Sequence, residues 1–246
     1  MKPRSLRAAV AAGALATLSM SFAACDSSDD GEEVTKLTYT GHIVDALDGA
    51  PLAGVELCIT SPSGIPCVTT DATGAYTIAE LPARTRVTAT VSKADYYPVA
   101  AAFITRDGDF TIDAVLLKKA LVELAFTTAG VTLDTNKGAV LVRAYDPALG
   151  QTSAVAGLSG EISPAAGEGP FYNAAQSIPP DAEATSDSGT WSVVNLDAGT
   201  YQVRTFGTGR TCPGTFHWPG DKGAGWIETP VLAGHVTYVY VDCPAE

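Results

Sequence analysis

The chain has 246 residues, and 46% of them are hydrophobic, which is enough for the core of one large domain or two ordinary ones. Its 27 acidic residues outnumber its 15 basic residues, so the formal net charge is −12. This charge repels nucleic acids and anionic lipid headgroups, and it argues against a DNA- or RNA-binding function.

The first 24 residues have the layout of a secretory signal peptide. An apolar run over residues 8–22 is too short for a permanent transmembrane helix, and Ala23-Ala24 offers a small-residue cleavage point before Cys25. The basic residues before the run are Lys2, Arg4 and Arg7. Removal of residues 1–24 takes away these three basic residues and no acidic ones, so 12 basic groups remain against 27 acidic groups, a net charge of about −15.

Phe22-Ala23-Ala24-Cys25 also resembles the lipobox of bacterial lipoproteins. In that family the cysteine is diacylated and becomes the new N-terminus. The resemblance implies that Cys25 carries a lipid such as palmitate and holds the protein to a membrane of the bacterial cell envelope, at the periplasmic face or the cell surface. An ordinary secretory signal with an incidental cysteine is the alternative. Residues 25–35 then form a tether, which we expect to be disordered because it is acidic and has little apolar surface to bury.

Four cysteines follow the tether, and an even number in an exported chain indicates two disulfides. Cys58 and Cys67 flank the turn signal Ser-Pro-Ser-Gly at 61–64, and strands paired symmetrically about this turn bring the two cysteines face to face. Cys212 is then expected to pair with Cys243. A zinc site is the competing interpretation. The chain has no Cys-x-x-Cys motif and its three histidines are scattered, so we do not favour it.

From residue 37 onward, apolar and polar residues alternate with period two, as in half-buried β-strands. Turn signals separate these runs every eight to twelve residues, which is typical of a β-sandwich or barrel. The apolar faces are expected at Leu37, Tyr39 and Ile43, at Val55, Leu57 and Ile59, and at Val87, Ala89 and Val91. The sequence therefore predicts an all-β fold.

A set of turn and core residues follows in a fixed order: Gly41, Asp45, Pro51-Leu52, Gly54, Thr70-Asp71, Gly74, Tyr76, Ile78 and Leu81-Pro82. Through these positions, residues 36–118 resemble the carboxypeptidase regulatory-like domain, a small transthyretin-like (Ig-like) β-sandwich. Simple mechanical roles explain them: Gly74 provides the positive φ of a tight turn, and Asp71 caps that turn. The resemblance implies a fold, with little about activity, because such modules serve as accessory, spacer or binding units.

Residues 119–246 repeat the pattern faintly and predict a second, diverged sandwich in tandem with the first. Asp187 to Leu196 echoes Asp71 to Leu81, and Gly138 to Val142 echoes the stretch from Gly54 to Leu57. We expect strands at 121–126 and 236–241. Residues 148–184 are too long for an ordinary hairpin loop and predict an insertion, either an extra hairpin or a surface loop.

No catalytic constellation or cofactor motif stands out, so neither an enzyme activity nor a cofactor is expected. Asp45, Asp48 and Asp71 would suit Ca²⁺ if they met at one end of the first sandwich, but turn aspartates are common in such folds and a metal site is not favoured.

The stretch that most resembles a binding site is the Gly-rich segment 207–227. Its aromatic residues suit stacking on sugar rings or anchoring a protein partner, and a Cys212–Cys243 disulfide would hold its base. The candidate ligand-binding residues are Phe216, His217, Trp218, Asp221 and Trp226. In the competing interpretation, the tryptophans fold back to cover an open end of a sandwich.

The sequence thus favours a non-enzymatic, lipid-anchored bacterial envelope protein with a structural, adhesive or partner-binding role. Its expected partners are the membrane, through the N-terminal lipid, and a glycan or an envelope protein. A carbohydrate-binding module that uses segment 207–227 is the first alternative. An accessory subunit of an envelope enzyme or secretion complex is the second.

Overall fold

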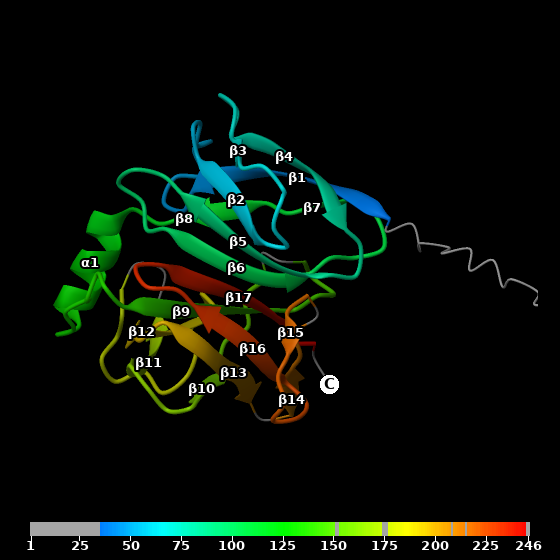
Figure 1. Ribbon diagram of the computed structural model, residues 1–246. Coiled ribbons are helices and arrows are strands. Elements are labelled where there is room, and N and C mark those ends of the chain that lie inside the picture. Colours follow the sequence, from blue (N-terminus) through cyan, green and yellow to red (C-terminus); the bar gives the residue numbers. More distant parts are fainter. Residues whose placement is uncertain (1–34, 151–152, 174–176, 208, 215, 245–246) are drawn as a thin grey trace, which may run out of the picture. The chain divides into compact units, whose positions relative to one another are not determined.

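The computed structural model describes residues 35–150, 153–173, 177–207, 209–214 and 216–244 (Figure 1). The expected signal peptide, Cys25 and all of the expected tether except Thr35 lie outside these residues. Residues 34–246 form one compact unit. In the described part of the chain, no helix is long and apolar enough to cross a membrane.

The first half of the chain contributes a four-stranded sheet. Strand β4 (Ala75–Pro82) pairs with β1 (Lys36–Asp45) in antiparallel orientation. Two short strands, β7 (Phe110–Thr111) and β8 (Ala114–Leu116), pair with β1 in parallel. The second half contributes a five-stranded sheet. Its strands are β10 (Ser159–Ser163), β13 (Gly199–Gly207), β16 (Trp226–Val231) and β15 (Trp218–Pro219), with β14 (Arg210–Cys212) paired to β13.

A third sheet of eight strands takes members from both halves. From the second half come β11 (Glu168–Asn173), β12 (Thr190–Leu196), β9 (Gly138–Tyr145) and β17 (Val236–Asp242). From the first half come β6 (Val99–Ile104), β5 (Arg86–Ser92), β2 (Glu56–Ser61) and β3 (Val68–Thr69). The halves meet where β17 pairs in parallel with β6, from Val236↔Val99 to Tyr238↔Ala101 (Figure 1). We call this eight-stranded sheet the shared sheet.

The two sandwiches use opposite faces of the shared sheet. Val99 and Tyr238 lie on the face that packs into the first core, together with Tyr39 and Ile43 of β1. The neighbours of Tyr238 along β17 point the other way, and Val239 belongs to the second core. This follows from the two-residue period of a strand, which sends successive side chains to opposite faces. The predicted all-β architecture with two tandem sandwiches is confirmed, and so are the three predicted apolar faces of the first sandwich.

A buried threonine holds the edge loop of the first sandwich in place. The Thr70 hydroxyl donates a hydrogen bond to the Leu52 carbonyl (2.6 Å) and accepts one from the Val55 amide (2.9 Å). Thr70 is 5% exposed, so both bonds lie in a region of low dielectric, where an unmade hydrogen bond is costly. This explains why a threonine occupies this position of the family pattern.

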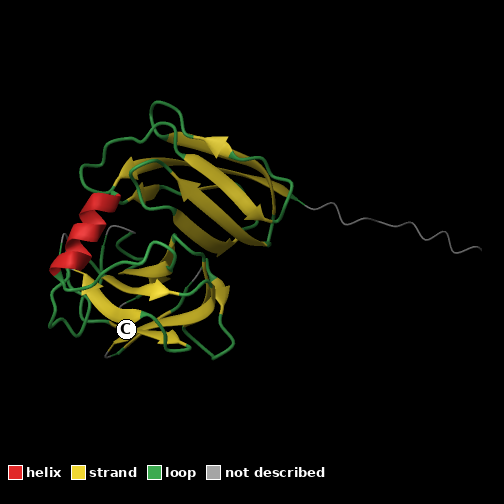
Figure 2. Ribbon diagram, turned by 60° about the vertical axis from the view of Figure 1, so that its left-hand side comes forward, coloured by secondary structure: helices red, strands yellow, loops and turns green. Residues whose placement is uncertain are grey.

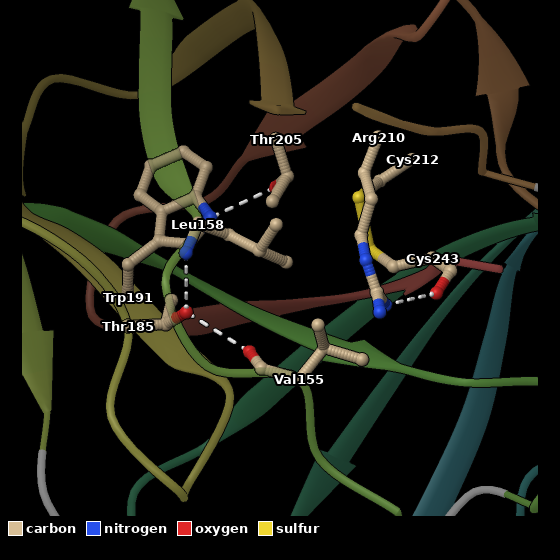
Figure 3. The surroundings of a disulfide bond; sticks show 8 residues. All are labelled: Val155, Leu158, Thr185, Trp191, Thr205, Arg210, Cys212 and Cys243. Atoms are coloured by element: carbon tan, nitrogen blue, oxygen red, sulfur yellow. Dashed lines mark hydrogen bonds between the residues drawn. A yellow bond between two sulfur atoms is a disulfide. The ribbon is translucent and has the colours of Figure 1, made fainter. Parts of the chain in front are cut away.

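The second sandwich repeats the same arrangement with other residues. The Thr185 hydroxyl donates to the Val155 carbonyl (2.9 Å) and accepts from the Leu158 amide (3.0 Å), as Figure 3 shows. The turn glycines also correspond. Gly74 accepts a backbone hydrogen bond from Ile43 (2.9 Å), and Gly189 accepts one from Ala144 (2.8 Å). Identical hydrogen bonds at matching places make the second sandwich a structural repeat of the first.

This repeat supports one of the two predicted correspondences between the halves of the sequence and corrects the other. The turn before Trp191 corresponds to the turn before Tyr76, as expected from Asp187 to Leu196. The counterpart of Gly54 is Gly157, since both glycines have positive φ (69° and 77°) and donate to the buried threonine of their sandwich. Gly138 is therefore not that counterpart, because it begins β9, which corresponds to β1.

Two further expectations are wrong. Residues 121–126 form part of a helix, α1 (Lys119–Thr128), which is drawn red in Figure 2. The segment lacks period-two alternation, and Val122 and Phe126 are spaced to share one helical face. Residues 148–184 contain β10 and β11, which belong to different sheets and so form neither a hairpin with each other nor a simple surface loop. The expected strand at 236–241 is confirmed as β17.

The predicted hairpin between β2 and β3 is confirmed. Glu56 pairs with Thr69 and Leu57 with Val68, which is the register expected from a symmetric turn. Cys58 and Cys67 form the disulfide of this hairpin, and Cys212 and Cys243 form the second.

Gly74 offers a direct test of the turn that both sandwiches share. Its φ is +76°, and a Cβ at this position would lie 2.6 Å from the Ile43 carbonyl oxygen. We expect Gly74→Val to lower the free energy of unfolding by about 2 kcal/mol or more, because it adds left-handed strain to a backbone clash. Urea denaturation and protease digestion would measure this. Gly108→Val is the matched control, since a Cβ at Gly108 meets nothing within 4 Å. Equal stability of the two variants would contradict the assignment of the turn.

Candidate functional site

The aromatic segment 216–218 lies at the joint between the two sandwiches. Beyond Ala101, β6 and β17 no longer pair, and the side chain of His217 connects them instead. Its Nδ1 is 2.7 Å from the Ala102 carbonyl on β6, and its Nε2 accepts a hydrogen bond from the Tyr240 amide on β17 (2.9 Å). The imidazole thus replaces ladder hydrogen bonds that the diverging strands cannot make.

This geometry fixes the protonation state of His217. The Nε2 atom accepts a hydrogen bond from the Tyr240 amide and so carries no proton, and Nδ1 is the protonated nitrogen that donates to the Ala102 carbonyl. The ring is 9% exposed, and burial lowers the pKa of His217 below its usual value of 6.5. Hydrogen bonding and the nearby charge of Asp242 oppose this shift without cancelling it. His217 is therefore a structural, neutral histidine with both nitrogens engaged, and it is not available to a ligand.

The residues on either side of His217 also form hydrogen bonds with the backbone of β6. The Trp218 indole nitrogen donates to the Phe103 carbonyl (3.0 Å), and the Phe216 carbonyl accepts from the Ile104 amide (2.7 Å). Loop residues therefore satisfy the edge of β6 where β17 leaves it. A buried or half-buried strand edge without such partners would cost free energy.

Two arginines complete the joint. The Arg106 guanidinium lies 3.9 Å from the centre of the Phe216 ring, and that of Arg86 lies 5.0 Å from the centre of the Trp218 ring. Arg86 also forms an ion pair with Glu228 (3.1 Å), which links β5 of the first sandwich to β16 of the second. Trp218 therefore contacts the body of the protein through its ring nitrogen and its ring face.

Trp226 lies elsewhere, on the outer face of the five-stranded sheet. Its ring is half-buried beneath two cations, with Arg204 4.9 Å and Lys222 5.5 Å from the ring centre. Arg204 also covers the Phe206 ring (4.8 Å), and Phe206 is exposed. Asp221 is exposed and accepts a hydrogen bond from Gln202 on the same face. The structure therefore divides the five candidate residues into two groups, three in the joint and two on this outer face.

The aspartates considered for calcium do not converge. Asp45 is 2% exposed, and its carboxylate accepts from the Leu47 amide (2.8 Å) and the Tyr96 hydroxyl (2.7 Å) and pairs with Lys118 (2.9 Å). Burial alone would raise the pKa of Asp45, but these bonds outweigh it and lower the pKa to about 2. Asp48 and Asp71 cap their own turns. Among the described residues, the single group spaced for a metal is Glu56 with Cys58 and Cys67, and these two cysteines are joined in a disulfide.

The second disulfide joins the last residue of β14 to the residue that follows β17. Cys212 and Cys243 are both fully buried, and Arg210 donates to the Cys243 carbonyl (3.1 Å), as Figure 3 shows. Nearby, Trp191 fills the second core and its indole nitrogen donates to Thr205 (2.9 Å). The third tryptophan is thus a core residue.

Comparisons with known proteins agree with the fold of the first half. Residues 38–142 match the family model of the carboxypeptidase regulatory-like domain. A comparison with curated proteins gives no match.

Solved structures show weaker likeness. The 3-chlorocatechol 1,2-dioxygenase of Rhodococcus opacus 1CP is 15% identical, with 36% of this chain and 62% of that chain covered and a TM-score of 0.29. A type II cohesin–X-dockerin complex of Acetivibrio cellulolyticus is 19% identical, with 32% of this chain and 56% of that chain covered and a TM-score of 0.27. The Bacillus anthracis TIE protein is 16% identical, with 85% of this chain and 34% of that chain covered and a TM-score of 0.29. The chain spans less than two thirds of each of these structures, and TM-scores this low carry no argument about function.

The state of His217 predicts how stability depends on pH. The unfolded chain takes up a proton at His217 below about pH 6.5, whereas the folded chain resists it, so this contribution is complete above pH 6.5 and is lost as the pH falls toward the lowered pKa. Within that range we expect the free energy of unfolding to fall by up to about 1.4 kcal/mol per pH unit. Urea unfolding at pH 7.5, 6.5 and 5.5 measures it.

His217→Gln should remove this part of the slope, while His42→Gln, at an exposed histidine on β1, should leave it unchanged. An unaltered slope in the His217 variant would show that the imidazole is not held neutral.

Proposed function

We propose that this chain, which carries a carboxypeptidase regulatory-like domain at residues 38–142, is a lipid-anchored bacterial envelope protein with a non-catalytic structural or binding role. Domains of this family are non-catalytic units. The observation that carries the proposal is the joint, because side chains of the kind that often form active sites or ligand platforms are used there to hold two sandwiches together.

The joint favours a role in which a fixed spacing matters. A continuous sheet, an imidazole bridge and an ion pair between β5 and β16 all resist bending between the sandwiches. Each sandwich also carries one disulfide, which limits the freedom of the unfolded chain and suits an oxidising compartment. Anchored through Cys25, such a unit would present its far surface to another envelope component at a defined distance.

A carbohydrate-binding function is the second candidate, and the outer face of β13 and β16 favours it. Phe206 and Trp226 are aromatic rings on one face of the sheet, and polar partners for sugar hydroxyls lie beside them in Gln202, Arg204 and Asp221. This face differs from the site expected from the sequence, since Phe216 and His217 play no part in it.

The membrane anchor can be tested directly. Cells expressing the full chain and fed labelled palmitate should incorporate the label into the protein, and Cys25→Ala should abolish it, because the thiol is the acylated group. Ser27→Ala, an alanine substitution two residues away that leaves every cysteine in place, serves as the control. Label that persists after Cys25→Ala, or that never appears, would overturn the lipoprotein assignment.

Two tryptophan variants separate the structural and glycan-binding roles. We expect Trp226→Ala to retain most of the stability and to lose retention on a glycan array. Trp218→Ala should instead lower the free energy of unfolding by roughly 2–4 kcal/mol, because a half-buried ring and its hydrogen bond to Phe103 are lost. Glycan binding that survives Trp226→Ala, or a wild-type protein that binds no glycan, would rule out this face as a sugar site.

A further inference from the structure

A cavity of about 610 Å³ lies between helix α1 and the shared sheet. Its roof is the apolar side of α1, including Val122, Ala125 and Phe126, and its floor is the face of β9 and β12 that carries Ala139, Leu141 and Val194. This volume is in the range of sites that enclose small molecules, which are mostly apolar with a few polar groups at fixed places.

Exposed apolar side chains gather at this cavity. Among the described residues, six large hydrophobic side chains are exposed, and three of them, Leu47, Leu121 and Leu124, line it. Leu124 is 63% exposed although it belongs to a helix that packs on the body of the protein. Isolated exposed apolar residues are ordinary, but a cluster beside a cavity indicates a surface that another molecule covers.

Helix α1 covers the floor through Phe126 and, in part, through Val122 and Ala125. It buries one residue, Phe126, which contacts Phe171 edge to face with ring centres 5.6 Å apart. The helix has ten residues, no side-chain cap and no acidic residue in its first turn, and Lys119 stands at the end where the helix dipole disfavours a cation.

Three lysines and three carboxylates line the cavity. The chain has six lysines after residue 24, and three of them, Lys118, Lys119 and Lys137, line the cavity. Lys118 pairs with Asp45 and Lys137 with Asp197, while Lys119 makes no ion pair among the described residues. The other lining carboxylates, Glu123 and Asp134, accept hydrogen bonds from Tyr97 and Asn136. In a chain this acidic, an unpaired lysine beside an apolar cavity suits an anionic headgroup.

The geometry points to a binding site for a single-chain anionic amphiphile, with its hydrocarbon chain between α1 and the shared sheet and its headgroup near Lys119. A methylene group occupies roughly the volume of a water molecule, whose share of the liquid is about 30 Å³, so a cavity of about 610 Å³ has room for a chain of up to roughly 20 carbons. This site is separate from the joint and from the outer face of β13, and it does not depend on the anchor at Cys25.

Residues 34–246 are suited to the test because they form one compact unit and lack the apolar signal segment. Tritiated palmitate and lysophosphatidylglycerol are titrated separately, below their critical micelle concentrations, which distinguishes a fatty acid from a lysophospholipid as the source of the chain. We expect saturable binding of at least one of them with a stoichiometry of one. Absence of saturable binding for both overturns the proposal.

Variants on opposite walls of the cavity locate the site. Ala125→Trp on α1 and Ala139→Phe on β9 should each weaken binding at least tenfold, because they fill the space that the chain occupies. Leu149→Trp adds the same bulk at an exposed leucine outside the cavity and should have no effect. Lys119→Glu should weaken palmitate binding three- to tenfold and leave hexadecanol binding unchanged.

Each variant is first checked for an unaltered unfolding midpoint, and two wall positions are used so that one poorly folded variant does not decide the result. Wild-type affinity in a correctly folded wall variant would place the ligand elsewhere and overturn the proposal. The result is independent of palmitate labelling at Cys25, which reports a covalent bond.

Discussion

The parallel pairing of β17 with β6 determines how the two halves of this protein are arranged. It covers three residue pairs, yet it joins two sheets into one and places the sandwiches on opposite faces of it. Because side chains alternate along a strand, Tyr238 serves the first core while Val239 serves the second. Neither core can be displaced without disturbing the other through this strand. The pair ends where the strands diverge, and His217 then carries the connection with its two ring nitrogens.

This joint also decides which residues remain available to ligands. Phe216, His217 and Trp218 satisfy the edge of β6, and an edge left unpaired inside a joint would be destabilising. The other aromatic residues of interest, Phe206 and Trp226, lie on the outer face of the five-stranded sheet, where the Arg204 guanidinium lies over both rings. Recognition of a partner is therefore more consistent with the outer face of β13 and β16 than with the loop at the joint.

Much of the first sandwich could be predicted because its determinants are local. The period-two pattern gives the buried faces, and the turn at 61–64 gives both the β2–β3 register and the Cys58–Cys67 disulfide. The role of His217 could not be predicted, since it depends on two strands that come together from distant parts of the chain. Helix α1 was predictable in principle from the spacing of Val122 and Phe126, but its short apolar run also suits a strand. The repeat was misplaced at Gly138 because a glycine followed by apolar residues can begin either of two strands, and the matching threonine, Thr185, identifies the correct one.

Placing two sandwiches on opposite faces of one sheet has a geometric consequence, because each half of the shared sheet then has one face that no second sheet covers. The two halves meet this problem differently. On β2 and β5 the uncovered face carries threonines such as Thr60 and Thr88, which bond to each other and tolerate water. On β9 and β12 it carries apolar residues such as Leu141 and Val194, which need a cover.

Helix α1 provides that cover incompletely. It is anchored at its C-terminal end through Phe126, and a cavity remains over the floor of β9 and β12. The cavity is thus a product of the shared sheet, and an apolar ligand chain would complete the packing that the fold leaves open there.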